Sequence, residues 1–259
     1  MSNSDLPGAP IWIELYTEDT QAAAAFYGEL FGWTTVDSGP EYGGYVTFQR
    51  DGEPVAGLMR NDGTTGGVNS WSVYLESDDV TNTVGMAEAN GGEIEIEPMQ
   101  VGALGHMAFV TDPSGARVGI WQPLEHQGFA ARAEVGAPAW FELLTSDYES
   151  VIPFYRNVFG WDTHTMSDTD EFRYTTLGKD EEARAGIMDA KNLLDGQRSR
   201  WSFYVQVEDT DVAVKRALAA GANELMRVDD SPYGRLAAIA DPVGVPFMLM
   251  GPNLAPQDD

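Results

Sequence analysis

The chain of 259 residues contains no cysteine and only three histidines, His106, His126 and His164. The absence of cysteine excludes disulfide bonds, thiolate nucleophiles and every zinc or iron–sulfur site that is built on cysteine. Lysine is also rare, and 15 basic residues against 41 acidic ones leave a formal net charge of −26. Because such a surface repels nucleic-acid phosphates, we expect no nucleic-acid partner.

Long apolar runs are missing as well. No segment approaches 18 apolar residues, and the first ten residues lack both a basic start and an apolar stretch. We therefore expect no signal peptide, no membrane partner and a soluble, cytoplasmic protein. The hydrophobic content of 43%, with 11% aromatics, is nevertheless typical of a chain that folds around hydrophobic cores.

The sequence contains an internal repeat. Residues 9–33, APIWIELYTEDTQAAAAFYGELFGW, correspond to residues 137–161, APAWFELLTSDYESVIPFYRNVFGW. Farther along, GHMAFVTDPSGA at 105–116 corresponds to GRLAAIADPVGV at 234–245. We therefore expect two similar modules, module 1 over residues 1–122 and module 2 over residues 137–259, joined by a linker at 123–136.

Each module is expected to contain two β-α-β-β units. In module 1 the alternating segment 11–16 predicts a strand, and Asp19 or Thr20 then caps a helix. An Asp51-Gly52 turn indicates a hairpin. Further strands are expected at 45–50, 54–60, 70–76, 107–111 and 117–122, and a second helix at 80–89.

A Phe-Tyr pair on the first helix of each module, a following Phe-Gly-Trp and an Asp-Pro-x-Gly turn resemble the vicinal oxygen chelate superfamily. This superfamily contains glyoxalase I, extradiol dioxygenases, fosfomycin-resistance enzymes and bleomycin-binding proteins. The resemblance covers residues 9–122 and 137–250. It implies an α+β fold of two tandem glyoxalase-like modules, each built of paired βαβββ units whose mixed sheets curl into cups. It also implies a monomer whose modules pair within the chain, or a homodimer.

The resemblance further implies where a metal would bind. Enzymes of the superfamily usually hold one divalent ion with His, Gln or Glu side chains from three strands of a module. Counting along the matching motifs places these three positions at Trp12, Ser72 and Gly119 in module 1, and at Trp140, Ser202 and Met248 in module 2. None of these residues supplies an imidazole or a carboxylate, so we predict no cofactor and no metal there. A register shift of two residues would bring Glu14 and Glu142 to these positions, which keeps a divalent metal possible.

Strand alternation turns aromatic side chains into both cups. With Trp12 facing inward, Glu14 and Tyr16 lie on the same face. Apolar walls with a few polar groups are typical of small-molecule pockets, although the same rings can equally be packed core that fills the cups. The candidate ligand-binding residues are Trp12, Tyr16, Trp71, Tyr74, His106, Trp121, Trp140, Trp201, Tyr204, Arg235 and Met248.

Glu14 and Glu142 are the candidate catalytic residues. Desolvation beside indoles raises the pKa of a carboxyl group, which suits a general acid or base, whereas a structural bond to a backbone amide or an arginine is the alternative. Arg235 is a candidate anion-binding residue and His106 a candidate proton carrier, with a plain surface position as the alternative for both. His126 and His164 are interpreted as solvent-exposed and without a role.

The first functional hypothesis is a metal-independent, small-molecule-binding protein of the glyoxalase and bleomycin-resistance type. The alternative is an enzyme acting on a small carbonyl or aromatic compound. It would be a glyoxalase-like lyase or isomerase with a Glu base, or a dioxygenase-like enzyme with a metal at a different position. A third hypothesis is a protein-interaction domain. The acid excess is expected to solvate the surface or to attract a cationic ligand.

Overall fold

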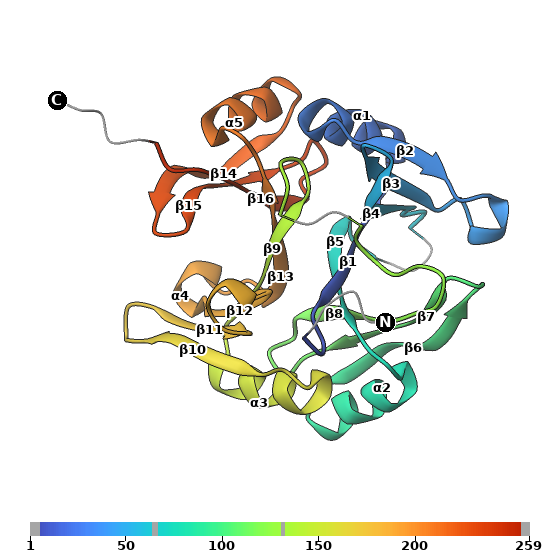
Figure 1. Ribbon diagram of the computed structural model, residues 1–259, viewed down its shortest axis with the longest axis vertical. Coiled ribbons are helices and arrows are strands. Elements are labelled where there is room, and N and C mark those ends of the chain that lie inside the picture. Colours follow the sequence, from blue (N-terminus) through green and yellow to red (C-terminus); the bar gives the residue numbers. More distant parts are fainter. Residues whose placement is uncertain (1–5, 64–66, 131–132, 255–259) are drawn as a thin grey trace. The chain divides into compact units, whose positions relative to one another are not determined.

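The computed structural model describes residues 6–63, 67–130 and 133–254. Module 1 forms a sheet in the strand order β2-β3-β4-β1-β5-β8-β7-β6, and module 2 forms a second sheet in the matching order β10-β11-β12-β9-β13-β16-β15-β14 (Figure 1). Strands β1 and β4 pair in parallel, as do β5 and β8, whereas β3–β4 and β7–β8 are antiparallel. The predicted α+β fold of paired βαβββ units with curved, mixed sheets is thereby confirmed.

The two modules repeat the same element order. The elements of module 1 are β1 (Pro10–Thr17), α1 (Thr20–Phe31), β2 (Thr34–Asp37), η1 (Pro40–Tyr42), β3 (Val46–Arg50), β4 (Glu53–Arg60), β5 (Ser70–Glu76), α2 (Val80–Ala89), β6 (Glu93–Val101), β7 (Gly105–Thr111) and β8 (Arg117–Pro123). Those of module 2 are β9 (Pro138–Thr145), α3 (Tyr148–Phe159), β10 (Thr163–Asp168), β11 (Arg173–Leu177), η2 (Asp180–Glu182), β12 (Ala185–Asp189), α4 (Lys191–Leu194), β13 (Arg200–Gln206), α5 (Thr210–Ala219), β14 (Asn223–Ser231), β15 (Gly234–Ala240) and β16 (Pro246–Gly251).

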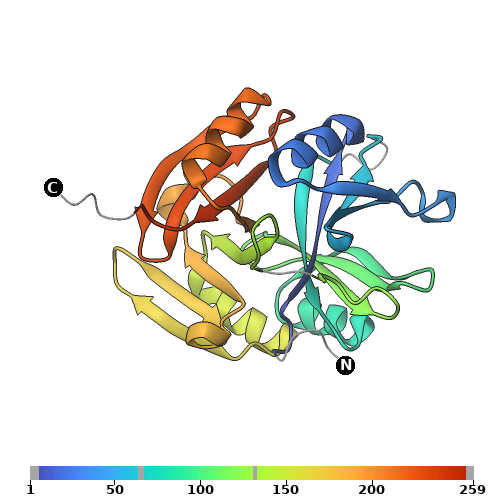
Figure 2. The ribbon, with the colours of Figure 1, turned by 45° about the horizontal axis from the view of Figure 1, so that its top comes forward.

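The chain folds into two compact units, and each unit combines about one half of module 1 with one half of module 2. Unit 1 combines the chain up to residue 13 with 72–128 and 141–202, and unit 2 combines 14–71 with 129–140 and the chain from 203 onward. Unit 1 therefore contains the β5–β8 half of module 1 and most of the β9–β12 half of module 2. Figures 1 and 2 show α2 beside α3 within unit 1, and α1 beside α5 within unit 2.

Helices cover one face of each sheet. In unit 1, Leu75, Val110 and Ile120 alternate onto the face that α2 covers and are fully buried. In unit 2 the corresponding core is aromatic, because Tyr27 of α1 packs against Phe48 of β3 and Phe247 of β16. Burial of apolar side chains such as these is the main favourable contribution to folding.

Helix α1 begins as the sequence predicts. The side chain of Asp19 accepts a hydrogen bond of 2.9 Å from the backbone N–H of Ala22, which satisfies one of the amides at the start of the helix. The helix ends at Gly32, whose φ of +73° is the left-handed conformation that glycine adopts without strain. Trp33, the next residue, packs its ring against Phe48 of β3, with ring centroids 5.2 Å apart.

Two strands escape prediction from the sequence. Strand β2 is only four residues long and is exposed throughout, so it lacks an alternating pattern. Strand β6 alternates Glu and Ile but is largely exposed at the edge of its sheet. Both lie at the edges of their sheet. Strand β2 offers no pattern to detect, whereas the Glu-Ile alternation of β6 is a strand signal that the sequence does contain. None of the helices in the described part of the chain is long and apolar enough to cross a membrane.

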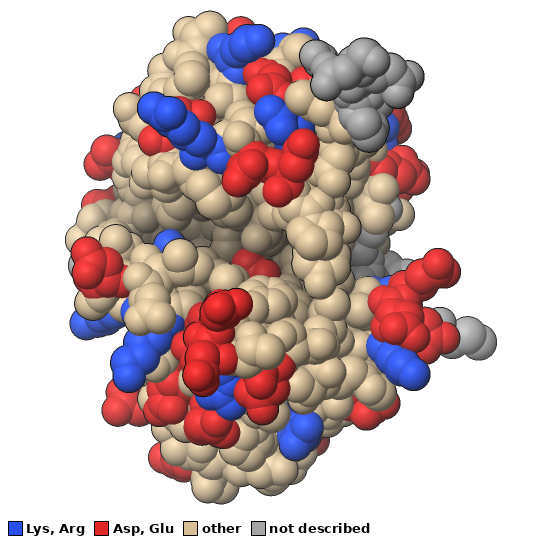
Figure 3. Space-filling view, turned by 90° about the vertical axis from the view of Figure 1, so that its left-hand side faces the viewer, with Lys and Arg blue, Asp and Glu red and all other residues tan. Residues whose placement is uncertain are grey.

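On one face of the molecule the acidic side chains are dispersed rather than gathered in one patch (Figure 3). On the face drawn in Figure 3, Asp and Glu are spread over the described residues and interspersed with Lys and Arg. This distribution fits the expectation that the acid excess solvates the surface.

Candidate functional site

Unit 1 contains a buried Trp–Tyr–Asp triad that joins the two modules. The hydroxyl of Tyr155, on α3, donates a 3.0 Å hydrogen bond to Oδ2 of Asp112, in the turn between β7 and β8. The indole N–H of Trp201, on β13, donates to the same hydroxyl at 2.9 Å. Asp112 also accepts backbone hydrogen bonds from Ser114 and Ala116, so it holds its own turn as well.

The same triad recurs in unit 2 with the modules exchanged. Tyr27, on α1, donates to Oδ2 of Asp241 at 3.1 Å, and the indole of Trp71 donates to Tyr27 at 2.9 Å. Burial raises the pKa of Asp241 and, together with the charge of Asp241, raises the pKa of Tyr27 well above its usual value. The tyrosines are therefore neutral donors at physiological pH, as a structural role requires.

The triads correct one expectation from the sequence. Trp71 and Trp201 were expected to stack on a ligand, but both lie on the helix-covered face, where they bond to Tyr27 and Tyr155. Strand alternation explains this placement. Ser72 follows Trp71 and Ser202 follows Trp201, so each serine takes the face opposite to its tryptophan. The Phe-Tyr and Asp-Pro motifs that identify each module thus serve to join the modules.

The opposite face of the first sheet carries an aromatic cluster within unit 1. We define the module-1 aromatic cluster as Trp12, Tyr74, Phe109, Trp121 and His126. The imidazole of His126 lies edge-on to Trp12, with ring centroids 4.4 Å apart, and to Trp121, with centroids 5.5 Å apart. The indole of Trp121 donates a 3.0 Å hydrogen bond to the backbone oxygen of His126. Both indoles therefore contact one imidazole.

His126 is the cluster member that sequence reasoning missed. It lies after β8 in a segment without regular secondary structure, where neither alternation nor a motif marks it. The expectation that it is solvent-exposed is wrong, because its ring is partly buried between Trp12 and Trp121. Burial lowers the pKa of His126 to about 4, so the ring is neutral at physiological pH.

Tyr74 occupies the space beside Gly119. A Cβ atom added at Gly119 would lie 2.4 Å from Cδ1 of Tyr74, so the tyrosine ring covers the glycine directly. The two residues are register partners in the parallel pair β5–β8. Nearby, Oγ of Ser72 accepts a 2.8 Å hydrogen bond from Nη1 of Arg117. Two of the three positions that could carry metal ligands in module 1 are thus filled by other contacts.

The second sheet contains a carboxylate–phenol pair in unit 1. Tyr174, on β11, donates a 2.7 Å hydrogen bond to Oε1 of Glu142, on β9, and Glu142 is only 7% exposed. The ring of Tyr174 lies over Gly186, where an added Cβ would meet the hydroxyl at 2.0 Å. This contact places a buried carboxylate beside a proton donor. Such an arrangement occurs both in proton-transfer sites and in purely structural hydrogen bonds.

His106 and Arg235 lie on the helix-covered faces, not with the aromatic cluster. His106 is the register partner of Gln122, whose side chain accepts a hydrogen bond from the first amide of α2, at Val80. Arg235 forms ion pairs with Asp211 of α5 at 2.6 Å and with Asp230 of β14 at 2.8 Å. Both faces are set by strand pairing, and the sequence alone did not reveal which face each residue takes.

The remaining predicted residues lie in unit 2. Tyr204 and Met248 are register partners in the parallel pair β13–β16 and lie on one face. Glu14 and Tyr16 are register partners of Gly57 and Met59 in the pair β1–β4, and Trp140 belongs to β9. Two surface hollows of about 470 and 480 Å³ also lie in unit 2, and none of the predicted site residues lines either of them.

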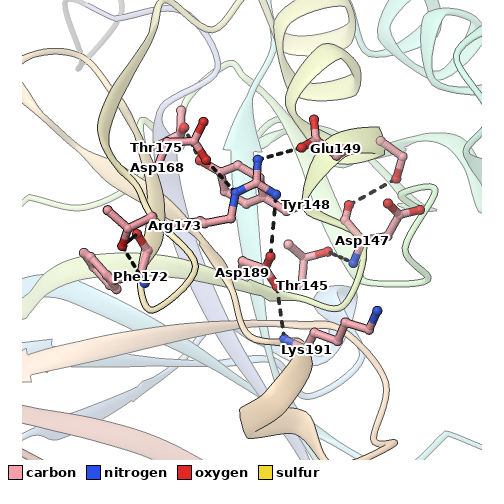
Figure 4. A network of polar contacts seen from close by, with 12 residues as sticks. Thr145, Asp147, Tyr148, Glu149, Asp168, Phe172, Arg173, Thr175, Asp189 and Lys191 are labelled. Atoms are coloured by element: carbon pink, nitrogen blue, oxygen red, sulfur yellow. Dashed lines mark hydrogen bonds and ion pairs between the residues drawn. The ribbon is translucent and has the colours of Figure 1, made fainter.

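Unit 1 also contains a charged network on the helix-covered side (Figure 4). Arg173, on β11, pairs with Glu149 at 2.6 Å, with Asp168 at 2.6 Å and with Asp189 at 3.8 Å. Its guanidinium carbon lies 4.5 Å from the ring centroid of Tyr148. Hydrogen bonds to Glu149 and Asp168 raise the pKa of Arg173 still further. Three carboxylates satisfy this cation, so the network is structural.

Comparison with known proteins identifies the family. Residues 10–120 match the Glyoxalase/Bleomycin resistance protein/Dioxygenase superfamily, and residues 140–250 match a Glyoxalase-like domain. The chain belongs to this superfamily. CFP32 of Mycobacterium bovis, which carries the provisional name of a glyoxylase, is 34% identical over 96% of both chains. The anthracycline biosynthesis proteins DauV of Streptomyces sp. strain C5 and DnrV of Streptomyces peucetius are 33% identical over 94% of this chain and 93% of theirs.

Solved structures of the superfamily share the fold. The Mn(II)-bound glyoxalase from Novosphingobium aromaticivorans superposes with a TM-score of 0.65 at 15% identity, over 95% of this chain and 82% of that chain. The 2,3-dioxygenase LapB from Pseudomonas sp. KL28 superposes with a TM-score of 0.63 at 14% identity, over 98% and 96%. At these identities the likeness concerns the fold alone.

The residues of this chain do not fit the metal that the superfamily implies. Trp12 offers an indole, Ser72 is bonded to Arg117, and Gly119 is covered by Tyr74. Module 2 has Trp140, Ser202 and Met248 at the same positions, again without imidazole or carboxylate. Within residues 6–63, 67–130 and 133–254, no three His, Asp or Glu side chains come together as a metal site would need.

Proposed function

We propose that this protein is a metal-independent small-molecule-binding protein, and that the module-1 aromatic cluster binds a planar aromatic ligand. The observation that carries the proposal is the position of His126 against Trp12 and Trp121. The imidazole is a flat ring that contacts two indoles, and a flat ligand ring could make the same contacts with a larger area. His126 thus stands where the ligand ring would bind.

Burial of the cluster makes His126 the residue that must move. Trp12 is 4% exposed and Trp121 is 7% exposed, so a ligand reaches the indoles only after a covering side chain turns aside. Trp12 and Trp121 belong to central strands, whereas His126 belongs to an irregular segment that changes conformation at lower cost. We therefore assign to His126 the role of a cover that the ligand displaces.

The names of two relatives agree with an aromatic ligand. DauV and DnrV are named for anthracycline biosynthesis, and anthracyclines are planar, fused-ring aromatic compounds. Their similarity spans both modules of this chain rather than a single motif. A compound of this shape offers a flat ring that can replace the imidazole against the two indoles.

The test is binding of a neutral planar probe, 2-(hydroxymethyl)anthraquinone, measured by isothermal titration calorimetry. We expect Trp12→Ala to weaken binding at least tenfold because it removes one of the two indoles that contact the ligand ring. Trp140→Ala, at the equivalent position of module 2, is the matched control and is expected to change affinity less than twofold. Near-ultraviolet circular dichroism checks that each variant is folded, and Trp12→Phe serves if Trp12→Ala is not. Equal affinity in both alanine variants would overturn the proposal.

Metal independence is tested separately by elemental analysis. The purified protein is exposed to Ni²⁺, Zn²⁺, Mn²⁺ and Fe²⁺, and loosely held metal is removed. We expect far less than one ion per chain to remain, because the ligand positions lack imidazole and carboxylate. Retention of one ion per chain would contradict this part of the proposal and would favour a glyoxalase-like or dioxygenase-like enzyme.

A second candidate function is proton transfer on a small carbonyl compound at Glu142. The hydrogen bond from Tyr174 to the buried Glu142 favours it, because a phenol can return a proton that a carboxylate removes. The measurement is deuterium exchange from solvent into the hemithioacetal of methylglyoxal and glutathione. Exchange that Glu142→Gln abolishes, and that Glu14→Gln in the other module leaves intact, would support this function. Exchange that is absent from the unmodified protein would exclude it.

A further inference from the structure

Arg117 lies on the same face of β8 as the aromatic cluster. Residues 117, 119 and 121 alternate onto one face, so Arg117, Gly119 and Trp121 follow one another along the strand. The guanidinium carbon of Arg117 lies 3.4 Å from the ring centroid of Phe109. Phe109 in turn contacts Tyr74, with ring centroids 5.0 Å apart. The arginine is therefore continuous with the cluster through Phe109.

Two donor atoms of the Arg117 guanidinium group, Nε and Nη1, form hydrogen bonds in the protein. Nε donates to Oε2 of Glu95 at 2.6 Å, and Nη1 donates to Oγ of Ser72 at 2.8 Å. A guanidinium group has five N–H donors, so three remain, two of them on Nη2. Among the contacts of the described residues, none involves Nη2 of Arg117. The Arg117 side chain is 38% exposed, so a ligand can reach these donors.

Two other arginines on strands of this acidic chain pair with more carboxylates than Arg117 does. Arg173 faces three carboxylates, and Arg235 forms ion pairs with both Asp211 and Asp230. In the described structure Arg117 forms an ion pair with Glu95 alone. Its other hydrogen-bond partner, Ser72, is a neutral acceptor. A planar guanidinium with free parallel N–H groups is suited to a carboxylate.

Stacking fixes the direction of the free donors. Because Phe109 is 3% exposed and held in the sheet, the guanidinium plane that rests on it has little freedom to rotate. Four residues separate Arg117 from Trp121, which corresponds to about 13 Å along a strand. A fused-ring compound that stacks near Trp121 would carry an acidic substituent within reach of Arg117. Module 2 has Pro246 at the equivalent strand position, so this feature is confined to module 1.

We infer that the ligand of the module-1 aromatic cluster is an aromatic carboxylic acid, and that Arg117 binds its carboxylate through Nη1 and Nη2. This inference rests on the proposed function, because it names the ligand class of the same cluster. In this arrangement the rings contact the indoles while the charge is held at the other end of the face. The arginine thus selects for an anion among planar aromatic compounds.

The test compares two probes of equal shape, anthraquinone-2-carboxylate and 2-(hydroxymethyl)anthraquinone. The unmodified protein is expected to bind the acid at least tenfold more tightly at low ionic strength, with a smaller preference at high salt. Arg117→Gln is expected to abolish the preference for the acid. Arg227→Gln, which removes an exposed arginine of β14, changes the net charge equally and is expected to keep the preference.

Each outcome separates the inference from the proposed function. Equal binding of both probes by the unmodified protein overturns the inference and leaves the proposed function standing. A preference for the acid that survives in Arg117→Gln also overturns it, because another cation must then bind the carboxylate. Binding of neither probe overturns both. If Arg117→Gln unfolds, Arg117→Lys replaces it, and a partial loss of preference is then the expected result, since lysine offers a point charge without paired donors.

Discussion

The hydroxyl of Tyr155 donates to the carboxylate of Asp112, which lies 43 residues earlier in the chain and in the other module. Tyr27 and Asp241 repeat the relationship across 214 residues with the roles of the modules exchanged. A single-module polypeptide carries both halves of such a pair but would need a second copy to bring them together, because here each bond joins different modules. The repeat therefore encodes its own means of assembly.

Loss of a triad hydroxyl should destabilise the protein without changing its fold. Tyr155→Phe removes the donor to Asp112 and the acceptor of Trp201, and all three groups are buried. We expect the free energy of unfolding to fall by about 1–3 kcal/mol, as for other buried groups that lose a hydrogen-bond partner. Urea denaturation followed by circular dichroism measures the change.

The matched control for this prediction is Tyr233→Phe. Tyr233 is 58% exposed, and its variant should unfold as the unmodified protein does. Tyr27→Phe should reproduce the effect of Tyr155→Phe, and the double variant should show the sum, since the two triads share no residue. A value for Tyr155→Phe within 0.3 kcal/mol of the control, on the order of ordinary surface substitutions, would contradict a stabilising role.

The sequence was sufficient for the repeat, the fold class and the family, because these depend on local pattern and on motif order. It was less informative about which face of a strand a residue occupies when both faces of the sheet are buried. Trp71 is an example, because an aromatic side chain can be buried on either face of the strand. Its hydrogen bond to Tyr27 shows that it lies on the helix-covered face. Alternation from Ser72 would have placed Trp71 correctly had it been applied strictly.

Contacts between distant segments lay beyond prediction. His126 lies in an irregular segment after β8 and contacts Trp12 of β1. The segment has no periodic pattern from which this contact could be predicted. Arg235 is directed by Asp211 on a helix and by Asp230 on an edge strand. Such partners come together through tertiary packing, which a single sequence does not display.

Gly119 should be intolerant of any side chain. An added Cβ would meet the buried ring of Tyr74 at 2.4 Å, and neither central strand can easily shift. We expect Gly119→Ala to lower the free energy of unfolding by about 1–3 kcal/mol through overpacking. Gly85→Ala is the control, because Gly85 is helical with open space around it, and it should stabilise the protein by up to about 1 kcal/mol.

A second variant identifies the cause of the Gly119 effect. If the clash with Tyr74 is responsible, Gly119→Ala combined with Tyr74→Leu should lose less stability than the two single changes together. Strict additivity of the two changes would show that the ring does not cause the penalty. Differential scanning calorimetry of the four proteins provides the comparison.

Protonation of His126 should weaken the fold in mildly acidic solution. The pKa of His126 is about 4 in the folded protein against about 6.5 in an unfolded chain, so the unfolded state takes up the proton first as pH falls. The stability contributed by the neutral ring is complete above pH 6.5 and is lost progressively between pH 6.5 and pH 4. The linkage corresponds to a loss of up to about 2 kcal/mol at pH 5.

The measurement is urea denaturation at pH 7.5 and pH 5 for the unmodified protein and for His126→Phe. The phenylalanine keeps a ring against the two indoles but does not titrate, so its loss of stability at pH 5 should be smaller by the same amount. Val36→Phe, at an exposed position of β2, is the control, since it adds a phenylalanine and leaves His126 in place. An identical pH dependence in His126→Phe and the unmodified protein would show that His126 is not the responsible group.

Arg173 should stabilise unit 1 by neutralising three carboxylates at once. Glu149, Asp168 and Asp189 come from α3, β10 and β12, so removal of the cation leaves three negative charges that repel one another across three elements (Figure 4). Arg173→Met keeps an apolar stem over Tyr148, and we expect it to lower Tm by several degrees. Because salt screens repulsion between partly exposed charges, the difference from the unmodified protein should shrink in 1 M NaCl. Arg198→Met, at an exposed position, is the control for the change in net charge. An equal loss of Tm in both variants would show that net charge alone, and not the Arg173 network, causes the effect.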